Sequence, residues 1–161
     1  MKVFTAEKIN ELVERSSISS RLRLHQNIHA DYSEACQRLF NAIEPGSYIR
    51  PHRHKTFPRD ELLVAVRGLM VLVTFKDDGR LLDVMHFGTE KYGPDIAIGV
   101  ELDPQTWHTV LAVVPGSVLF EVKAGPYDPT HPKDYAEWAP EENSPNAHAY
   151  MQRLQEHLNK K

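Results

Sequence analysis

Two histidines, His52 and His54, stand one residue apart among basic residues in the stretch RPHRHK, shortly before the apolar run ELLVAVRG. Successive side chains of a strand point to opposite faces, so in an extended chain both imidazoles lie on one face. Two neutral imidazoles in this arrangement can chelate a single divalent ion. The spacing therefore predicts a metal site, and the alternative is a cationic patch on the surface.

Two further residues complete a candidate ligand set. Glu61 begins the apolar run, and His108 lies in a second segment typical of a strand. Three imidazoles and one carboxylate suit iron, manganese, nickel, cobalt or zinc, and this donor set does not choose among them. We therefore expect one divalent ion bound by His52, His54, Glu61 and His108. Asp60 is the alternative oxygen donor, although a strand neighbour of Glu61 points to the opposite face.

Three other residues are candidates for binding a substrate beside the ion. If residues 47–54 are extended, Tyr48 and Arg50 share the face of the two histidines. An arginine there can bind a carboxylate or phosphate, and its alternative is an ion pair within the fold. Tyr48 can donate a hydrogen bond or serve as a packed aromatic. Lys123, in the alternating segment LFEVKAG, faces either the site or the solvent.

Composition limits the classes of protein to consider. The chain has 161 residues, 41% of them hydrophobic, which is enough for one domain with its own core. The net charge of −3 does not favour a nucleic-acid partner, and no apolar run approaches the roughly 20 residues of a membrane span. The N-terminal segment lacks the apolar core of a signal peptide, and the single cysteine fits a reducing compartment. We expect a soluble cytoplasmic protein.

The elements expected to position these residues form a single domain, 1–161, in three parts. Residues 1–34 contain a short amphipathic helix and an irregular lead-in. Residues 35–125 alternate short apolar runs with turn signals such as EPGS and VPGS, which predicts an antiparallel β-barrel or jelly roll. Residues 126–161 form a loop and a final helix. The expected fold class is therefore all-β with terminal helices.

The segment from Gly46 to Gly68 resembles the first cupin motif, in which a glycine precedes the paired histidines and a glutamate and a second glycine follow them. Glu61 keeps the six-residue spacing to Gly68, whereas KTFPRD lengthens the gap between His54 and Glu61. The stretch PQTWH, which ends at His108, resembles the second cupin motif.

More narrowly, residues 20–142 resemble the WbuC family of cupin-fold metalloproteins through NIH, QRLFNAIEPGSYIRPHRH, WHTV, FEVKAGPY and WAPEE. The resemblance implies a cupin-type antiparallel β-barrel (jelly roll) with one bound divalent metal. It also implies that Asn27 and His29 lie at the rim of the ligand site. The family takes its name from gene clusters for surface polysaccharide (O-antigen), which implies a role in bacterial surface-polysaccharide metabolism.

The final helix bears on the oligomeric state. Met151, Leu154 and Leu158 form an apolar stripe along it, which must be covered by the barrel or by a partner subunit. Because cupins commonly dimerise, we expect a homodimer.

The expected function is to bind or act on a small sugar-like or carboxylated metabolite. As an enzyme, the protein is a metal-dependent isomerase or epimerase, or a cupin dioxygenase; otherwise it is a non-catalytic small-molecule binding or sensor module. An acid–base side chain near the ion favours an enzyme. A cavity lined only by apolar residues and the metal ligands favours a binding module.

Overall fold

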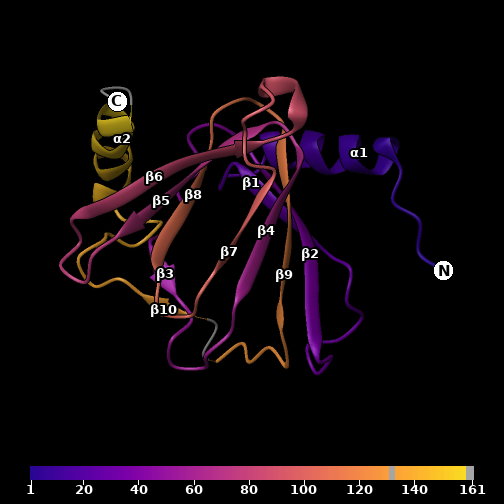
Figure 1. Ribbon diagram of the computed structural model, residues 1–161, viewed down its shortest axis with the longest axis horizontal. Helices are drawn as coiled ribbons and strands as arrows, with labels where there is room; N and C mark the ends of the chain where they lie inside the picture. The colour runs from indigo at the N-terminus through magenta and orange to yellow at the C-terminus, as the bar shows by residue number, and fades with distance from the viewer. Residues whose placement is uncertain (131–132, 159–161) are drawn as a thin grey trace.

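The computed structural model describes residues 1–130 and 133–158, so the last three residues of the predicted C-terminal segment lie outside the described residues. Two five-stranded antiparallel sheets face each other and form the barrel (Figure 1). The first sheet has the order β1 (Arg23–Asn27), β2 (Cys36–Ile43), β9 (Ser117–Ala124), β4 (Glu61–Arg67) and β7 (Gly99–Leu102). The second sheet has the order β10 (Asp134–Tyr135), β3 (His52–Arg53), β8 (Trp107–Ala112), β5 (Leu69–Phe75) and β6 (Leu81–Gly88). The predicted all-β jelly roll is confirmed.

The core lies between the two sheets. Alternating residues of the strands point inward and form one buried apolar cluster, which includes Ile43, Leu63, Met70, Leu72, Phe87 and Leu119. This cluster borders a polar cavity, described below, because Leu63 and Leu119 also line that cavity.

Gly68 makes the turn that joins β4 to β5 possible. Its φ of 81° lies in the left-handed region that favours glycine. A Cβ at this position would lie 2.8 Å from the Cα of Ser117, which is closer than real Cβ contacts allow. This close approach and the positive φ explain why a glycine stands at the turn that follows β4, with six residues between it and Glu61.

Helix α1 (Ala6–Ser17) covers the outer face of the first sheet (Figure 1). The side chain of Thr5 caps the helix by accepting a hydrogen bond from the backbone N–H of Lys8 at 3.4 Å. Leu12 is buried against Phe40 and Val118, which project outward from β2 and β9. The opposite alternation on β9 therefore turns Leu119, Glu121 and Lys123 inward.

Helix α2 (Asn146–Leu158) covers the outer face of the second sheet, at the far side of the barrel from α1 (Figure 1). Met151 and Leu154 are buried in a cluster that includes Val73 and Trp107. The apolar stripe of this helix is thus covered by its own barrel, and the expected homodimer stays a prediction without support from the stripe. A short 3-10 helix, Glu90–Tyr92, follows β6.

Two strands lie outside the range 35–125 predicted for the barrel. β1 pairs with β2 along five residues, and β10 pairs with β3. The inward residues of β1 are Arg23, His25 and Asn27, which line a polar cavity and not the apolar core. Strand prediction depends on alternating apolar residues, and this segment lacks them.

No helix within residues 1–130 and 133–158 has the length and apolar character needed to cross a membrane.

Candidate metal centre

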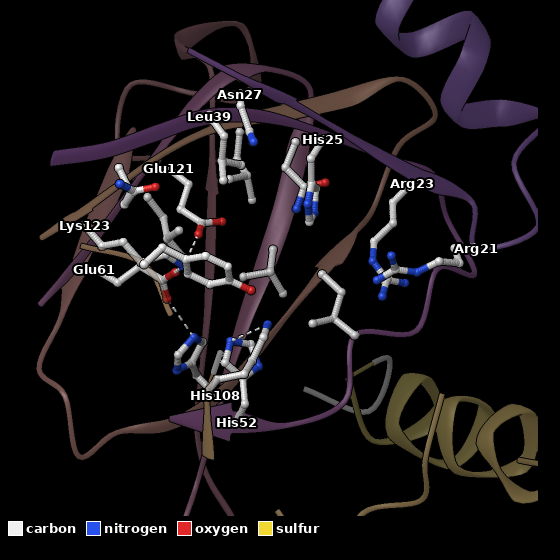
Figure 2. Close-up of a pocket in the computed structure, with 18 of the residues that line it drawn as sticks. Arg21, Arg23, His25, Asn27, Leu39, His52, Glu61, His108, Glu121 and Lys123 are labelled. Carbon is white, nitrogen blue, oxygen red and sulfur yellow. Dashed lines mark hydrogen bonds and ion pairs between the residues drawn. The ribbon is translucent and has the colours of Figure 1, made fainter. Parts of the chain in front are cut away.

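Four side chains from both sheets meet inside the barrel. His52 on β3 is paired with His108 on β8, His54 follows β3, and Glu61 begins β4 on the opposite sheet. All four are buried, and their possible ligand atoms lie within 4.8 Å of one another. Glu61 Oε2 is 3.0 Å from His108 Nε2 and 3.4 Å from His54 Nε2. Figure 2 shows Glu61 facing His52 and His108 across the cavity. The structure therefore brings together the complete ligand set predicted from the sequence.

Backbone carbonyls fix the orientation of two of the imidazoles. Nδ1 of His52 donates to the carbonyl of Arg50, and Nδ1 of His108 donates to the carbonyl of Thr106, each at 2.9 Å. This leaves Nε2 of both rings directed at the centre, an arrangement typical of histidine ligands. Nε2 of His54 is buried and makes no hydrogen bond to any residue of the described chain. A buried nitrogen without a partner is costly, so these residues fit a divalent ion.

The centre holds neutral imidazoles beside an ionised carboxylate. Burial lowers the pKa of His52 well below its ordinary value, and the positive charge of Lys133 lowers it further. Burial also lowers the pKa of His54. Burial opposes ionisation of Glu61, but the charge of Lys123 and the close imidazoles of His108 and His54 outweigh it and hold the pKa of Glu61 well below its ordinary value. Metal binding requires these protonation states.

Lys123 holds Glu61 in place. Its Nζ donates to Glu61 Oε1 at 3.0 Å and forms a second ion pair with Glu121, so one cation joins two carboxylates. Glu61 Oε2 remains directed at the imidazoles. Burial raises the pKa of Glu121, which the charge of Lys123 only partly offsets. The predicted site residue Lys123 therefore lies in the site and contacts a ligand residue of the ion.

A cavity of about 340 Å³ opens beside the four ligand residues. Figure 2 shows His25, Glu121 and Lys123 directed into the same space as His52 and His108. Polar residues form much of its wall: Arg21, Arg23, His25, Asn27, His29, Tyr32, Gln37, Asn41, Glu121, Lys123, Tyr127, Lys133, Tyr135 and Glu142. A volume near the lower end of the usual range for ligand sites suits one small molecule.

Asn27 and His29 line the cavity, where the family resemblance implied a rim. Asp60 is exposed, whereas Glu61 is buried in the centre, so Glu61 is the carboxylate of the cluster.

Tyr48 and Arg50 lie elsewhere and are not among the described residues that line the cavity. The hydroxyl of Tyr48 donates to the carbonyl of Pro140 at 2.8 Å, and the Arg50 guanidinium donates to the carbonyl of Ala136 at 2.8 Å. The predicted shared face required an extended chain over residues 47–54. That condition is not met: Ile49 and His52 both line the cavity although they are three residues apart, so the alternation breaks between them.

Sequence reasoning missed several residues of the cavity, above all His25 and Lys133. The irregular lead-in predicted for residues 1–34 contains His25, although RLHQN places polar residues at every second position, as one wall of a polar cavity requires. Lys133 lies eight residues beyond the end of the predicted barrel, and no local sequence pattern marks it as a site residue. Only the pairing of β10 with β3 brings it to His52.

The fold is shared with several solved structures. Protein SO0799 from Shewanella oneidensis aligns with a TM-score of 0.56 and 7% identity, covering 83% of this chain and 85% of that chain. An uncharacterized conserved protein with a double-stranded beta-helix domain from Klebsiella pneumoniae aligns with a TM-score of 0.53 and 14% identity, covering 77% and 90%. At these identities the likeness shows the fold alone. The double-stranded β-helix is the cupin barrel, so the predicted cupin-type fold is confirmed.

Among sequences, no curated protein matches the chain. One protein family matches residues 4–87, a range that contains His52, His54 and Glu61. Because this match spans more than half of the 161 residues, the chain belongs to the family described as Domain of unknown function (DUF6016).

Proposed function

We propose that this protein is a divalent-metal cupin that binds, and acts on, a small sugar-like or carboxylated metabolite. The observation that carries the proposal is the buried cluster of His52, His54, Glu61 and His108 at the wall of a polar cavity. A bound divalent ion supplies Lewis-acid chemistry, by which it polarises an oxygen of the metabolite. Four protein donors leave about two positions of a six-coordinate ion for other ligands.

The residues around the ion divide the remaining tasks. The imidazoles of His52 and His54 stay neutral because they are buried, and Lys123 orients the Glu61 carboxylate. Glu121, which faces the same cavity, has a raised pKa and can hold or release a proton close to a bound metabolite. An acid–base group at this position favours an isomerase-like or epimerase-like enzyme over a non-catalytic binding or sensor module.

The resemblance to the WbuC family supports a place in bacterial surface-polysaccharide metabolism. The single cysteine supports a cytoplasmic location, and the resemblance to cupins, which commonly dimerise, supports a homodimer.

Elemental analysis of the purified protein tests the metal, and proton exchange tests catalysis. We expect close to one equivalent of a first-row divalent metal per chain. A panel of monosaccharides and sugar acids in D₂O, followed by NMR, should show exchange of a carbon-bound proton with the wild type and at least 10-fold slower exchange with Glu121→Gln. Metal-loaded protein that binds a sugar acid without exchange in any substrate would favour the non-catalytic module. A wild type that takes up no divalent metal would end the proposal.

A further inference from the structure

Lys133 brings an ammonium group to the metal centre. Its Nζ lies 3.3 Å from Nε2 of His52. Because Nδ1 of His52 donates to the carbonyl of Arg50, Nε2 of this ring accepts a hydrogen bond and Lys133 is the donor. No carboxylate within residues 1–130 and 133–158 forms an ion pair with Lys133.

The other cations of the cavity are already paired. Lys123 contacts Glu61 and Glu121, while Arg21 and Arg23 both contact Glu142. The wall thus carries four cationic side chains and three carboxylates, an excess of one positive charge. A divalent ion at the four ligands raises this excess to three. A positively charged, partly desolvated cavity attracts an anion.

The ion also removes the hydrogen-bond acceptor that His52 offers to Lys133. Once Nε2 of His52 coordinates the ion, its lone pair no longer accepts a hydrogen bond from Nζ. An ammonium group left without an acceptor inside the protein is costly, and the nearby ion repels it as well. A negatively charged oxygen that lies against both the ion and Lys133 compensates both charges.

Two buried polar atoms in the cavity wall indicate what else the ligand carries. Nε2 of His29 and Oδ1 of Asn41 have no hydrogen-bond partner among the residues described. The amide oxygen of Asn41 can only accept, so it requires a donor such as a hydroxyl group. Satisfying these atoms favours a ligand with hydroxyl groups in addition to its charge.

A carboxylate fits this arrangement better than a phosphate. Phosphate sites commonly use helix N-termini or the forked guanidinium of arginine. Here both long helices cover the outer faces of the sheets, and the two arginines of the cavity are committed to Glu142. Lys133 offers one point charge, which suits a singly charged group.

We propose that the cavity takes a hydroxylated organic carboxylate, such as a sugar acid, and that Lys133 is the residue that selects its negative charge. The inference rests on the proposed function, because the ligand shares the cavity with the ion. Lys133 acts here as a specificity-determining residue, and Asn41 and His29 contact the hydroxyl groups.

Calorimetry with matched ligands tests this inference on the full chain loaded with one equivalent of Zn²⁺. D-Glucuronate and D-glucose share a ring and differ in a carboxylate in place of a hydroxymethyl group. We expect D-glucuronate to bind at least 10-fold more tightly than D-glucose and inorganic phosphate. Lys133→Met should weaken D-glucuronate binding about 10- to 100-fold, the range expected for a charged hydrogen bond. Lys133→Arg should restore part of the affinity, and Lys76→Met, at an exposed lysine, should change nothing.

Three results would overturn the inference while the protein still holds its zinc, which elemental analysis establishes separately. One is equal affinity for D-glucose and D-glucuronate, or no binding of either. Another is tight binding of phosphate alone. The last is a Lys133→Met variant that binds zinc more tightly and keeps its affinity for D-glucuronate, because Lys133 would then only compete with the ion. Loss of zinc from the wild type would instead contradict the proposed function itself.

Discussion

The two sheets bring different chemistry to the same cavity. The second sheet supplies the paired His52 and His108, whose ring nitrogens are oriented by backbone carbonyls. The first sheet supplies a charged row, Glu61, Lys123 and Glu121, on the adjacent strands β4 and β9. The comparison indicates that the histidine side offers most of the donors for an ion. The charged side adds one carboxylate donor, which Lys123 holds in place, and carries the groups that can exchange protons nearby.

Removing the histidine side should have the largest effect. The double substitution His52→Ala and His54→Ala deletes two of the four donors, so we expect metal affinity to fall by more than about 100-fold. Elemental analysis measures the metal, and circular dichroism should still show a folded barrel. His86→Ala, at an exposed histidine of β6, is the matched control. Full retention of one equivalent of metal by the double variant would refute the ligand assignment.

On the charged side, Asp60 and Glu61 are neighbours in the sequence, so substituting each in turn gives a matched pair of variants. Glu61→Gln removes the anionic donor and leaves Lys123 without this partner, so we expect a loss of metal of about 10- to 100-fold or more. Asp60→Asn should change nothing, because Asp60 is exposed while Glu61 is buried in the centre. The metal content of both purified variants is the measurement. Loss of metal from Asp60→Asn but not from Glu61→Gln would show that Asp60, and not Glu61, is the carboxylate ligand.

Lys123→Met tests whether Lys123, which is not a candidate ligand itself, supports metal binding by orienting the Glu61 carboxylate. The substitution leaves Glu61 and Glu121 close together without the cation between them. Residues that support a metal ligand typically contribute 10- to 100-fold in affinity, so we expect a loss of about 10-fold. Competition with a chelator measures the affinity, with Lys76→Met as the control. Unchanged zinc affinity would show that the barrel alone fixes Glu61.

Low pH should reduce both the stability of the protein and its metal occupancy, because groups on both sheets take up protons. Burial lowers the pKa of His52 and His54 below the ordinary 6.5, and the pKa of Glu61 is held below the ordinary 4.5. In each case the unfolded chain binds more protons, so stability is present above the ordinary pKa and falls as the pH drops below it. Metal occupancy should likewise fall below about pH 6, since protons compete for the imidazoles. Equilibrium dialysis with Zn²⁺ between pH 5 and 8 measures this. Constant occupancy down to pH 5 would contradict it.

The ligand set could be predicted from the sequence, and most of the cavity could not. His52 and His54 share a strand face by simple alternation. Gly68 marks the end of the strand that Glu61 begins, because the turn there needs a residue in the left-handed region. Lys133 reaches the centre through long-range pairing of two-residue strands, which leaves no periodic signal in the sequence.

Tyr48 gives the smallest expected effect and defines where the cavity ends. Its hydroxyl donates to the carbonyl of Pro140 and its ring packs against Tyr150 of α2, so it joins the terminal helix to the outside of the second sheet. Tyr48→Phe should lower the free energy of unfolding by about 1 kcal/mol, the usual contribution of one hydrogen bond, and leave zinc content and D-glucuronate affinity unchanged. Urea denaturation and calorimetry measure the two quantities. A hydroxyl bonded to Pro140 cannot also reach a ligand between the sheets. A variant with full stability and weakened ligand binding would therefore contradict this placement and show that Tyr48 contacts the ligand.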